Sequence, residues 1–323
     1  MLSTTTYLLF LDLVAKAIAT PILGLSLAPK YLTIAQSFAN GSTAVLVQFE
    51  GNSAYSAWFE ETARSPELDE EEAYEPALKE ALGAVQSAVN HILDQPAQMS
   101  IVTCPLSHRK PALEAMSQLD FLMSFDPYVI QYQTPYSALH YAYQLGKCEI
   151  VGLSEDCDPE DIFGAALWVD FNAASLRISL LDFSEYGCIR HAASDAISID
   201  DVAFPKDELE QPAKFLETAF ENFLDGYTAV TEPQASSHHE FVPLRSKIAA
   251  IVVSGDPLPQ YLEMLRDAVD HVSPELTDRI RDSIPPSEAM AIGAAKRGRL
   301  IWEHPEWFAI QEQNIVATPH EEL

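Results

Sequence analysis

The alternation of apolar and polar positions predicts two runs of strands and helices in the same order. In the first half of the chain we expect three strands, a helix, a strand and two helices. They cover residues 22–26, 31–37, 43–49, 79–93, 99–103, 110–119 and 137–145. Asn40-Gly41 predicts a positive-φ hairpin turn between the second and third strands, and Gly146 is expected to end the last helix.

The second half of the chain repeats this pattern. The expected elements are strands at 166–171, 176–183 and 187–193, a helix at 212–223, a strand at 248–253, and helices at 258–269 and 287–300. Residues 228–245 are expected to form a polar loop. Three strands, a helix, a strand and a helix, occurring twice, indicate a duplicated α/β fold, in which ligands are expected between two lobes.

Six short segments at corresponding places in this pattern carry a family resemblance. They are residues 22–26, 100–105, 137–145, 168–179, 251–256 and 286–295. In order and spacing they resemble the loops and connecting helices of the actin-like ATPase superfamily, most closely the nucleotide-binding domain of the seventy-kilodalton heat-shock chaperones. The resemblance covers residues 21–302 and implies a duplicated ribonuclease H-like α/β fold, with two lobes around a central cleft.

The resemblance, together with the apolar run near the N-terminus, divides the chain into parts. They are an N-terminal helix or cleavable signal segment at 1–20, lobe I at 21–146, lobe II at 147–285, a connecting helix returning to lobe I at 286–302, and a tail at 303–323. Residues 50–98 and 200–247 are short for the outer subdomains of the family, and no peptide-binding domain is expected after residue 302. The expected molecule is therefore not a complete folding chaperone.

Candidate binding residues follow from the resemblance, residue by residue. They are Gly24 and Ser26 in a first phosphate loop, Asp170, Asn172, Ser175 and Arg177 in a second, Gly255 and Asp256 in an adenosine motif, and Gly293 on a second connecting helix. Asp170 is expected at a strand end facing the cleft. A strand-end cap, or an ion pair with Arg177, is the alternative role for this carboxylate.

Several of these positions depart from the pattern of a working family member. The first loop has Gly24, Ser26, Leu27 and Ala28 where the family carries an aspartate, a glycine and threonines. The second loop keeps Asp170, but it has Asn172, Ala173 and Ala174 in place of a glycine triplet, Ser175 in place of a threonine and Arg177 in place of an aspartate. The adenosine loop keeps Gly255, with Ser254 and Asp256 replacing a glycine and a serine.

These departures change the expected chemistry. The Cβ of an alanine blocks the close approach of backbone N–H groups to a phosphate, which glycine permits. A cation such as Arg177 disfavours Mg²⁺ at the same place. Since hydrolysis needs the metal and a positioned water, we expect no catalytic residue, no metal site and no ATP hydrolysis.

Three functions remain open from the sequence. The first is a non-hydrolysing pseudo-ATPase that acts as a binding or scaffold module. The second is a nucleotide-binding protein with little or no turnover, in which Gly255 and Gly293 still accommodate weakly bound ATP or ADP. The third is an enzyme that has reused the cleft for a small apolar substrate, beside Leu27, Trp168 and Phe171. The expected partner is accordingly a protein, or a small molecule in the interlobe cleft.

Charge narrows the range of partners. The chain has 48 acidic and 19 basic side chains, for a formal net charge of −29. Such a surface repels nucleic acid and anionic membranes, so we expect neither as a partner, and no apolar stretch predicts a membrane span. The acidic run at 60–76 is expected to be a solvated helix face or loop. His238-His239-Glu240 and the distant His320 are candidate metal ligands, but an exposed loop is the favoured interpretation.

Three features bear on the cellular compartment. An apolar run at 7–14, followed by Ala17-Ile18-Ala19, fits either a packed amphipathic helix or a signal segment. Asn40-Gly41-Ser42 is a glycosylation sequon, although a hairpin turn also explains it. Cys148 and Cys157 could bridge in an oxidising compartment, but free buried thiols are favoured for all four cysteines. A cytoplasmic location is thus slightly favoured over secretion.

Overall fold

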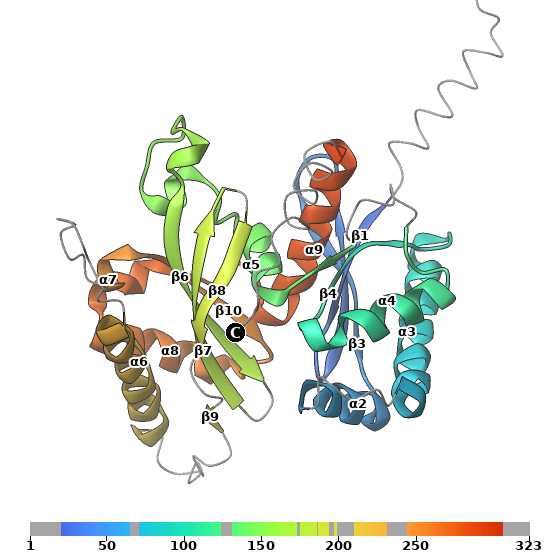
Figure 1. The fold of residues 1–323 in the computed structure, drawn as a ribbon, viewed down its shortest axis with the longest axis horizontal. Coiled ribbons are helices and arrows are strands. Elements are labelled where there is room, and N and C mark those ends of the chain that lie inside the picture. The colour runs from blue at the N-terminus through green and yellow to red at the C-terminus, as the bar shows by residue number, and fades with distance from the viewer. Residues whose placement is uncertain are drawn as a thin grey trace, which may run out of the picture. The chain divides into compact units, whose positions relative to one another are not determined.

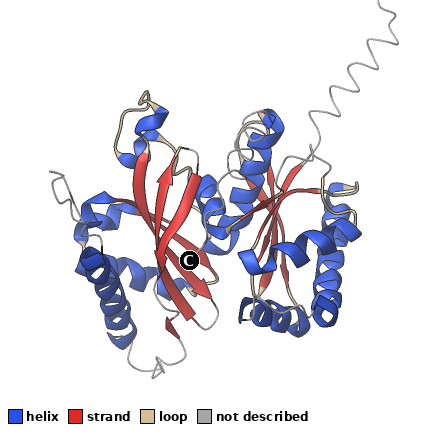
Figure 2. Ribbon diagram, in the orientation of Figure 1, coloured by secondary structure: helices blue, strands red, loops and turns tan. Residues whose placement is uncertain are grey.

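The chain consists of two compact units, each built on one mixed β-sheet with helices (Figure 1). In the computed structural model, the described residues are 21–64, 71–123, 131–172, 175–185, 187–193, 197–198, 210–230 and 244–305. The first unit comprises residues 1–133 and 294–323, and the second comprises residues 134–293. Figure 2 shows the sheet of each unit in red and the helices in blue.

The sheet of the first unit has the strand order β3-β2-β1-β4-β5. Its strands are β1 (Ile22–Leu27), β2 (Tyr31–Ser37), β3 (Thr43–Glu50), β4 (Met99–Thr103) and β5 (Tyr132–Gln133). The first three strands form an antiparallel meander, whereas β4 and β5 run parallel to β1. Gly41 takes a φ of 81° in the turn between β2 and β3. The predicted hairpin and its Asn40-Gly41 turn are confirmed.

Helices pack their apolar faces on this first sheet. They are α2 (Ser53–Arg64), α3 (Glu71–Leu93), the short 3-10 helix η1 (Leu106–His108) and α4 (Arg109–Gln118). Leu78, Leu82, Val85 and Val89 recur at helical spacing along α3 and lie fully buried against the strands. The helices expected at 79–93 and 110–119 are therefore confirmed, while α2 was not predicted.

The second sheet has the strand order β11-β10-β6-β7-β8, with β9 paired to β7 off this path. Its strands are β6 (Phe163–Asn172), β7 (Ser175–Ser184), β8 (Gly187–Ala193), β9 (Ile197–Ser198), β10 (Ile248–Gly255) and β11 (Ile280–Arg281). Again three antiparallel strands come first in the chain, and two later strands add parallel to the first of them. Both units thus share one strand arrangement, and the chain is a duplicated α/β protein of ribonuclease H-like lobes, as predicted.

The helices of the second unit follow the same plan. They are α5 (Pro135–Tyr143), α6 (Glu210–Val230), α7 (Leu244–Lys247) and α8 (Pro259–Val272), together with the 3-10 helices η2 (Cys148–Val151), η3 (Pro159–Asp161) and η4 (Pro274–Arg279). Helices α6 and α8 lie along one face of the sheet (Figure 1), where Phe220 and Leu265 pack on the side chains of Val169 and Phe171. This face forms the apolar core of the unit.

Two details differ from the sequence-based expectation. Helix α5 ends at Tyr143 and is capped by Gln144, which takes the left-handed conformation with a φ of 55°, so Gly146 is not the residue that stops it. The stretch 228–245 is not a loop throughout, because α6 extends to Val230 and α7 begins at Leu244; residues 231–243 lie outside the described part.

Helix α9 (Pro286–Glu303) is divided between the two units. Its residues up to Gly293 belong to the second unit, and those from Ala294 onward belong to the first. Helix α5 also belongs to the second unit, whereas the sequence suggested that lobe I extends to residue 146. The assignment of α5 and α9 as family-type connecting helices stays a prediction.

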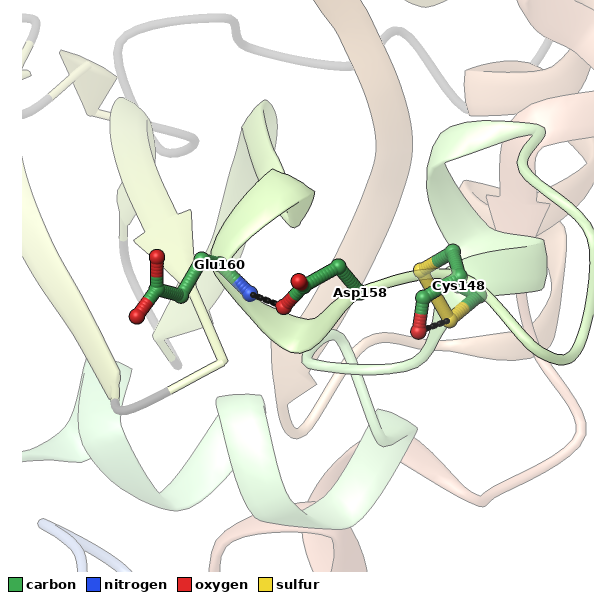
Figure 3. The surroundings of a disulfide bond; sticks show 4 residues. Cys148, Asp158 and Glu160 are labelled. Carbon is green, nitrogen blue, oxygen red and sulfur yellow. Dashed lines mark hydrogen bonds between the residues drawn. A yellow bond between two sulfur atoms is a disulfide. The ribbon is translucent and has the colours of Figure 1, made fainter.

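A disulfide bond joins Cys148 in η2 to Cys157, with the two Cα atoms 5.9 Å apart (Figure 3). Immediately after it, the backbone N–H of Glu160 donates to Asp158 Oδ1. The expectation of free thiols is therefore wrong for this pair. It is confirmed for Cys104 and Cys188, which are free and buried, and desolvation raises the pKa of both thiols to about 12.

Candidate functional site

The best-defined polar site lies in the second unit, where β6 and β10 run side by side. Parallel pairing sets Asp170 beside Ser254 and Phe171 beside Gly255. Alternation along β6 places Trp168 and Asp170 on one face of the sheet, while Val169 and Phe171 face the apolar core on the other. One face of this strand pair is therefore polar at its C-terminal end.

Three side chains on this face form a hydrogen-bonded chain. The indole Nε1–H of Trp168 donates to Ser254 Oγ over 2.7 Å, and the hydroxyl of Ser254 donates to Asp170 Oδ1 over 2.6 Å. Ser254 is fully buried and Trp168 nearly so. Each of these three side chains therefore has a hydrogen-bond partner within the group, as buried polar groups require.

The carboxyl group of Asp170 is electrostatically unusual. Desolvation raises its pKa above the ordinary aspartate value, while the hydrogen bond from Ser254 and the positive charge of Arg177 act in the opposite direction. Arg177 faces Asp170 across the β6–β7 pair, and its side chain is exposed. The raised pKa means that burial outweighs both stabilising contacts.

Next to this hydrogen-bonded chain, the backbones of β6 and β10 lie very close together at the ends of the two strands. Gly255 takes a φ of 94°, and a Cβ atom at this position would overlap the carbonyl of Phe171. The N–H of Asp256 donates to that same carbonyl over 3.0 Å. Only glycine fits a positive φ with so close a backbone neighbour, so Gly255 has a structural role in joining the ends of β6 and β10.

The structure brings together four of the candidate residues named from the sequence: Asp170, Arg177, Gly255 and Asp256. Asn172 and Ser175 pair through their backbones at the β6–β7 turn; their side chains, and residues 173–174, lie outside the described part. The first-loop candidates, Gly24 and Ser26, lie in β1 of the other unit.

Glycine at two of the candidate positions serves close helix packing. A Cβ atom on Gly24 would overlap the backbone of Ala294 and Ala295 in α9, within the first unit. A Cβ atom on Gly293 would overlap the carbonyl of Ala138 in α5, within the second unit. Neither glycine needs a ligand to explain it.

The role of Ser254 as the link between Trp168 and Asp170 is not apparent from the sequence. The alternation of residues 166–171 already places the indole and the carboxylate on one face. The parallel neighbour of Asp170 could not be read from that pattern, because β10 is distant in sequence. Pairing of β6 with β10 decides which hydroxyl reaches the carboxylate.

The three histidines named from the sequence as possible metal ligands differ from His140, which the structure describes. His238, His239 and His320 lie outside the described residues. His140 is buried in α5, and desolvation lowers its pKa to about 4, which keeps the ring neutral. Within the described ranges, no three His, Cys, Asp or Glu side chains gather in a way that could hold a metal ion. None of the helices described is long and apolar enough to cross a membrane.

Comparison with known proteins adds no further assignment. No protein family matches this chain, and no curated protein resembles it significantly in sequence.

Proposed function

We propose that this chain is a non-hydrolysing relative of the actin-like ATPases, of the heat-shock chaperone type, that acts as a binding or scaffold module. The observation that carries the proposal is the hydrogen-bonded chain from the buried Trp168 and Ser254 to the half-buried Asp170. Asp170 is the one acidic residue retained from the expected phosphate loops, and one of its carboxyl oxygens accepts a hydrogen bond from a protein hydroxyl.

The chemistry of this carboxyl group argues against a catalytic role. An aspartate that holds Mg²⁺ or its waters must be ionised and must direct its oxygens toward the ion. Burial of Asp170 raises its pKa and so disfavours the charged form. Ser254, where the family has a glycine, supplies the hydroxyl that binds Oδ1. The replacement thus gives Asp170 a structural partner.

Nucleotide binding without turnover is the second candidate, and one observation favours it. Gly255 keeps a positive φ at the end of β10, where the resemblance implies contact with adenosine. The contact that the resemblance implies is with adenosine and not with phosphate, so it needs no metal.

Phosphate release by the full chain in Mg²⁺ and ATP tests the proposal. We expect release at the background rate, unchanged in the Asp170→Asn variant, since the amide still offers an oxygen to Ser254. The Asp278→Asn variant is the matched control, because Asp278 is an exposed carboxylate of the same unit. Turnover that disappears in Asp170→Asn but persists in Asp278→Asn would contradict the proposal.

A further inference from the structure

We propose that Asn40 is an acceptor for N-linked glycosylation and that the chain matures in an oxidising, secretory compartment. Asn40 begins the sequon Asn40-Gly41-Ser42. No other asparagine in the sequence has a serine or threonine two positions after it. The three residues form the tip of the β2–β3 hairpin, and all of them are exposed. A glycosylating enzyme could therefore reach this tip without unfolding the sheet.

The local geometry suits the reaction. Asn40 Oδ1 accepts two hydrogen bonds, one from the hydroxyl of Ser42 over 2.7 Å and one from its backbone N–H over 3.0 Å. Both bonds end on the amide oxygen and polarise the side-chain amide, while the amide nitrogen takes part in neither. The hydroxyl required by the sequon thus already contacts the acceptor side chain in the folded hairpin.

The transfer uses a lipid-linked oligosaccharide pyrophosphate as the donor. Asn40 Nδ2 forms a bond to the anomeric carbon of the first sugar, and the bond from that carbon to the pyrophosphate oxygen breaks. The amide nitrogen loses one proton, and the lipid pyrophosphate leaves with the electron pair of the broken bond. No oxidant or reductant is needed.

An independent observation supports the compartment. Cys148 and Cys157 are joined by a disulfide, and such bonds form and persist mainly in secreted proteins and secretory compartments. The apolar run at 7–14 and the small residues Ala17 and Ala19 also fit a signal segment. Together with the exposed sequon, these features favour secretion over the cytoplasmic location that the sequence alone slightly favoured.

The test is expression of the full chain in a eukaryotic cell, followed by intact-mass measurement before and after peptide-N-glycosidase. We expect the mass to fall by one oligosaccharide, and peptide mass spectrometry to show Asp in place of Asn at position 40. The Ser42→Ala variant should lose the modification. Ser42→Thr, which keeps the sequon hydroxyl, should retain it and serves as the matched control for disturbance of the turn.

Each outcome decides the proposal. An enzyme-sensitive mass in the natural chain and in Ser42→Thr, but not in Ser42→Ala, supports it. A chain whose mass equals that of the bare polypeptide overturns it, provided that a known glycoprotein from the same cells is modified. Peptide mapping without reduction then shows whether Cys148 and Cys157 are bridged. If the disulfide is present but Asn40 is unmodified, the proposed glycosylation is rejected and the oxidising compartment is not. If both the disulfide and the modification are absent, the proposed compartment is rejected as well.

Discussion

Ser254 connects an indole and a carboxylate that lie two residues apart on the neighbouring strand. Its hydroxyl accepts from Trp168 and donates to Asp170, and all three groups are withdrawn from water to a large extent. Buried polar groups are costly when they lose a partner, because the remaining group keeps its desolvation penalty. The stability of the second unit should therefore depend on this one oxygen atom.

Replacing Ser254 by alanine should destabilise the protein by about 1–3 kcal/mol, because Trp168 Nε1–H and Asp170 Oδ1 each lose a hydrogen bond. Urea unfolding followed by circular dichroism measures the change. The matched control is Ser87→Ala in α3, where the serine is exposed, and this change should stay within about 0.5 kcal/mol. Equal stability of the two variants would show that the hydrogen-bonded chain contributes nothing.

Two buried histidines should make the protein sensitive to acid. His108 Nε2–H donates to Phe59 O, and its Nδ1 accepts from the hydroxyl of Ser107. Desolvation lowers the pKa of His108 from 6.5 to about 4, and burial does the same for His140. Between pH 6.5 and about 4, these histidines therefore bind protons in the unfolded chain but not in the folded chain. The stability that the neutral rings provide is present above pH 6.5 and is lost as the pH falls toward about 4.

The expected loss is at most about 3 kcal/mol for each histidine across that interval. Denaturant titrations at several pH values measure it. The His108→Phe variant keeps an aromatic ring against Trp58 and Phe59 but cannot bind a proton, so its stability should fall less steeply with acid. The exposed His91→Gln variant should keep the dependence of the natural chain. Identical slopes for all three proteins would contradict the assignment to His108.

At the scale of elements, close packing of β1 on α9 depends on a missing side chain. A Cβ atom on Gly24 would overlap the backbone of Ala294 and Ala295, which cannot move away as a flexible side chain could. Gly24→Ala should therefore destabilise the first unit by about 1–3 kcal/mol. Thermal unfolding with and without the substitution provides the measurement.

Gly83→Ala is the control for that change, because Gly83 lies in α3 and a Cβ atom there meets nothing within 4 Å. Alanine is the better helix former, so this variant should gain about 0.5–1 kcal/mol. If Gly24→Ala lowers the stability and Gly83→Ala raises it, the cost at position 24 comes from contact with α9 and not from the loss of a glycine. A stabilising Gly24→Ala would refute the packing argument.

Most elements could be predicted from the sequence because their signals are local. The strand over 31–37 ends at an Asn-Gly turn, and Leu78 to Val89 show helical spacing, so β2 and α3 follow from a few neighbouring residues. Helix α2 was missed because its apolar residues, Tyr55, Trp58 and Phe59, fall in a single short cluster before the acidic run. Strands β5 and β11 have two residues each, too few for any periodicity.

Other features could not be predicted from local sequence signals. The bridge between Cys148 and Cys157 depends on the turn between α5 and β6, which brings their Cα atoms to 5.9 Å. The partner of Asp170 likewise depends on β10, which pairs with β6 across most of the second unit. Helix α5 stops after Tyr143, where Gln144 takes the left-handed conformation, although Gly146 is the stronger local stop signal. For Asp170, the pairing of strands far apart in the sequence decides the partner, whereas the disulfide and the end of α5 depend on the conformation of a short stretch of backbone.

At the scale of the whole molecule, duplication is the central feature. Both sheets add two parallel strands to an antiparallel meander, and the same order of strands recurs in each unit. A fold of this kind can host many activities, so function must be argued from the residues that it carries. In this protein the acid expected near phosphate, Asp170, is half-buried and accepts a hydrogen bond from Ser254. The net charge of −29 also opposes an approaching polyphosphate.

The most direct test of this account is calorimetric and thermal-shift titration of the full chain with ATP and ADP, each with and without Mg²⁺. A ligand present at one hundred times its Kd would stabilise the protein by about 2.7 kcal/mol, which thermal unfolding detects easily. The account predicts no Mg²⁺-dependent shift with either nucleotide. A small metal-independent shift would favour the second candidate, nucleotide binding without turnover. A Mg²⁺-dependent shift that Asp170→Asn abolishes would contradict the account, because it would show that Asp170 still serves a metal–phosphate site.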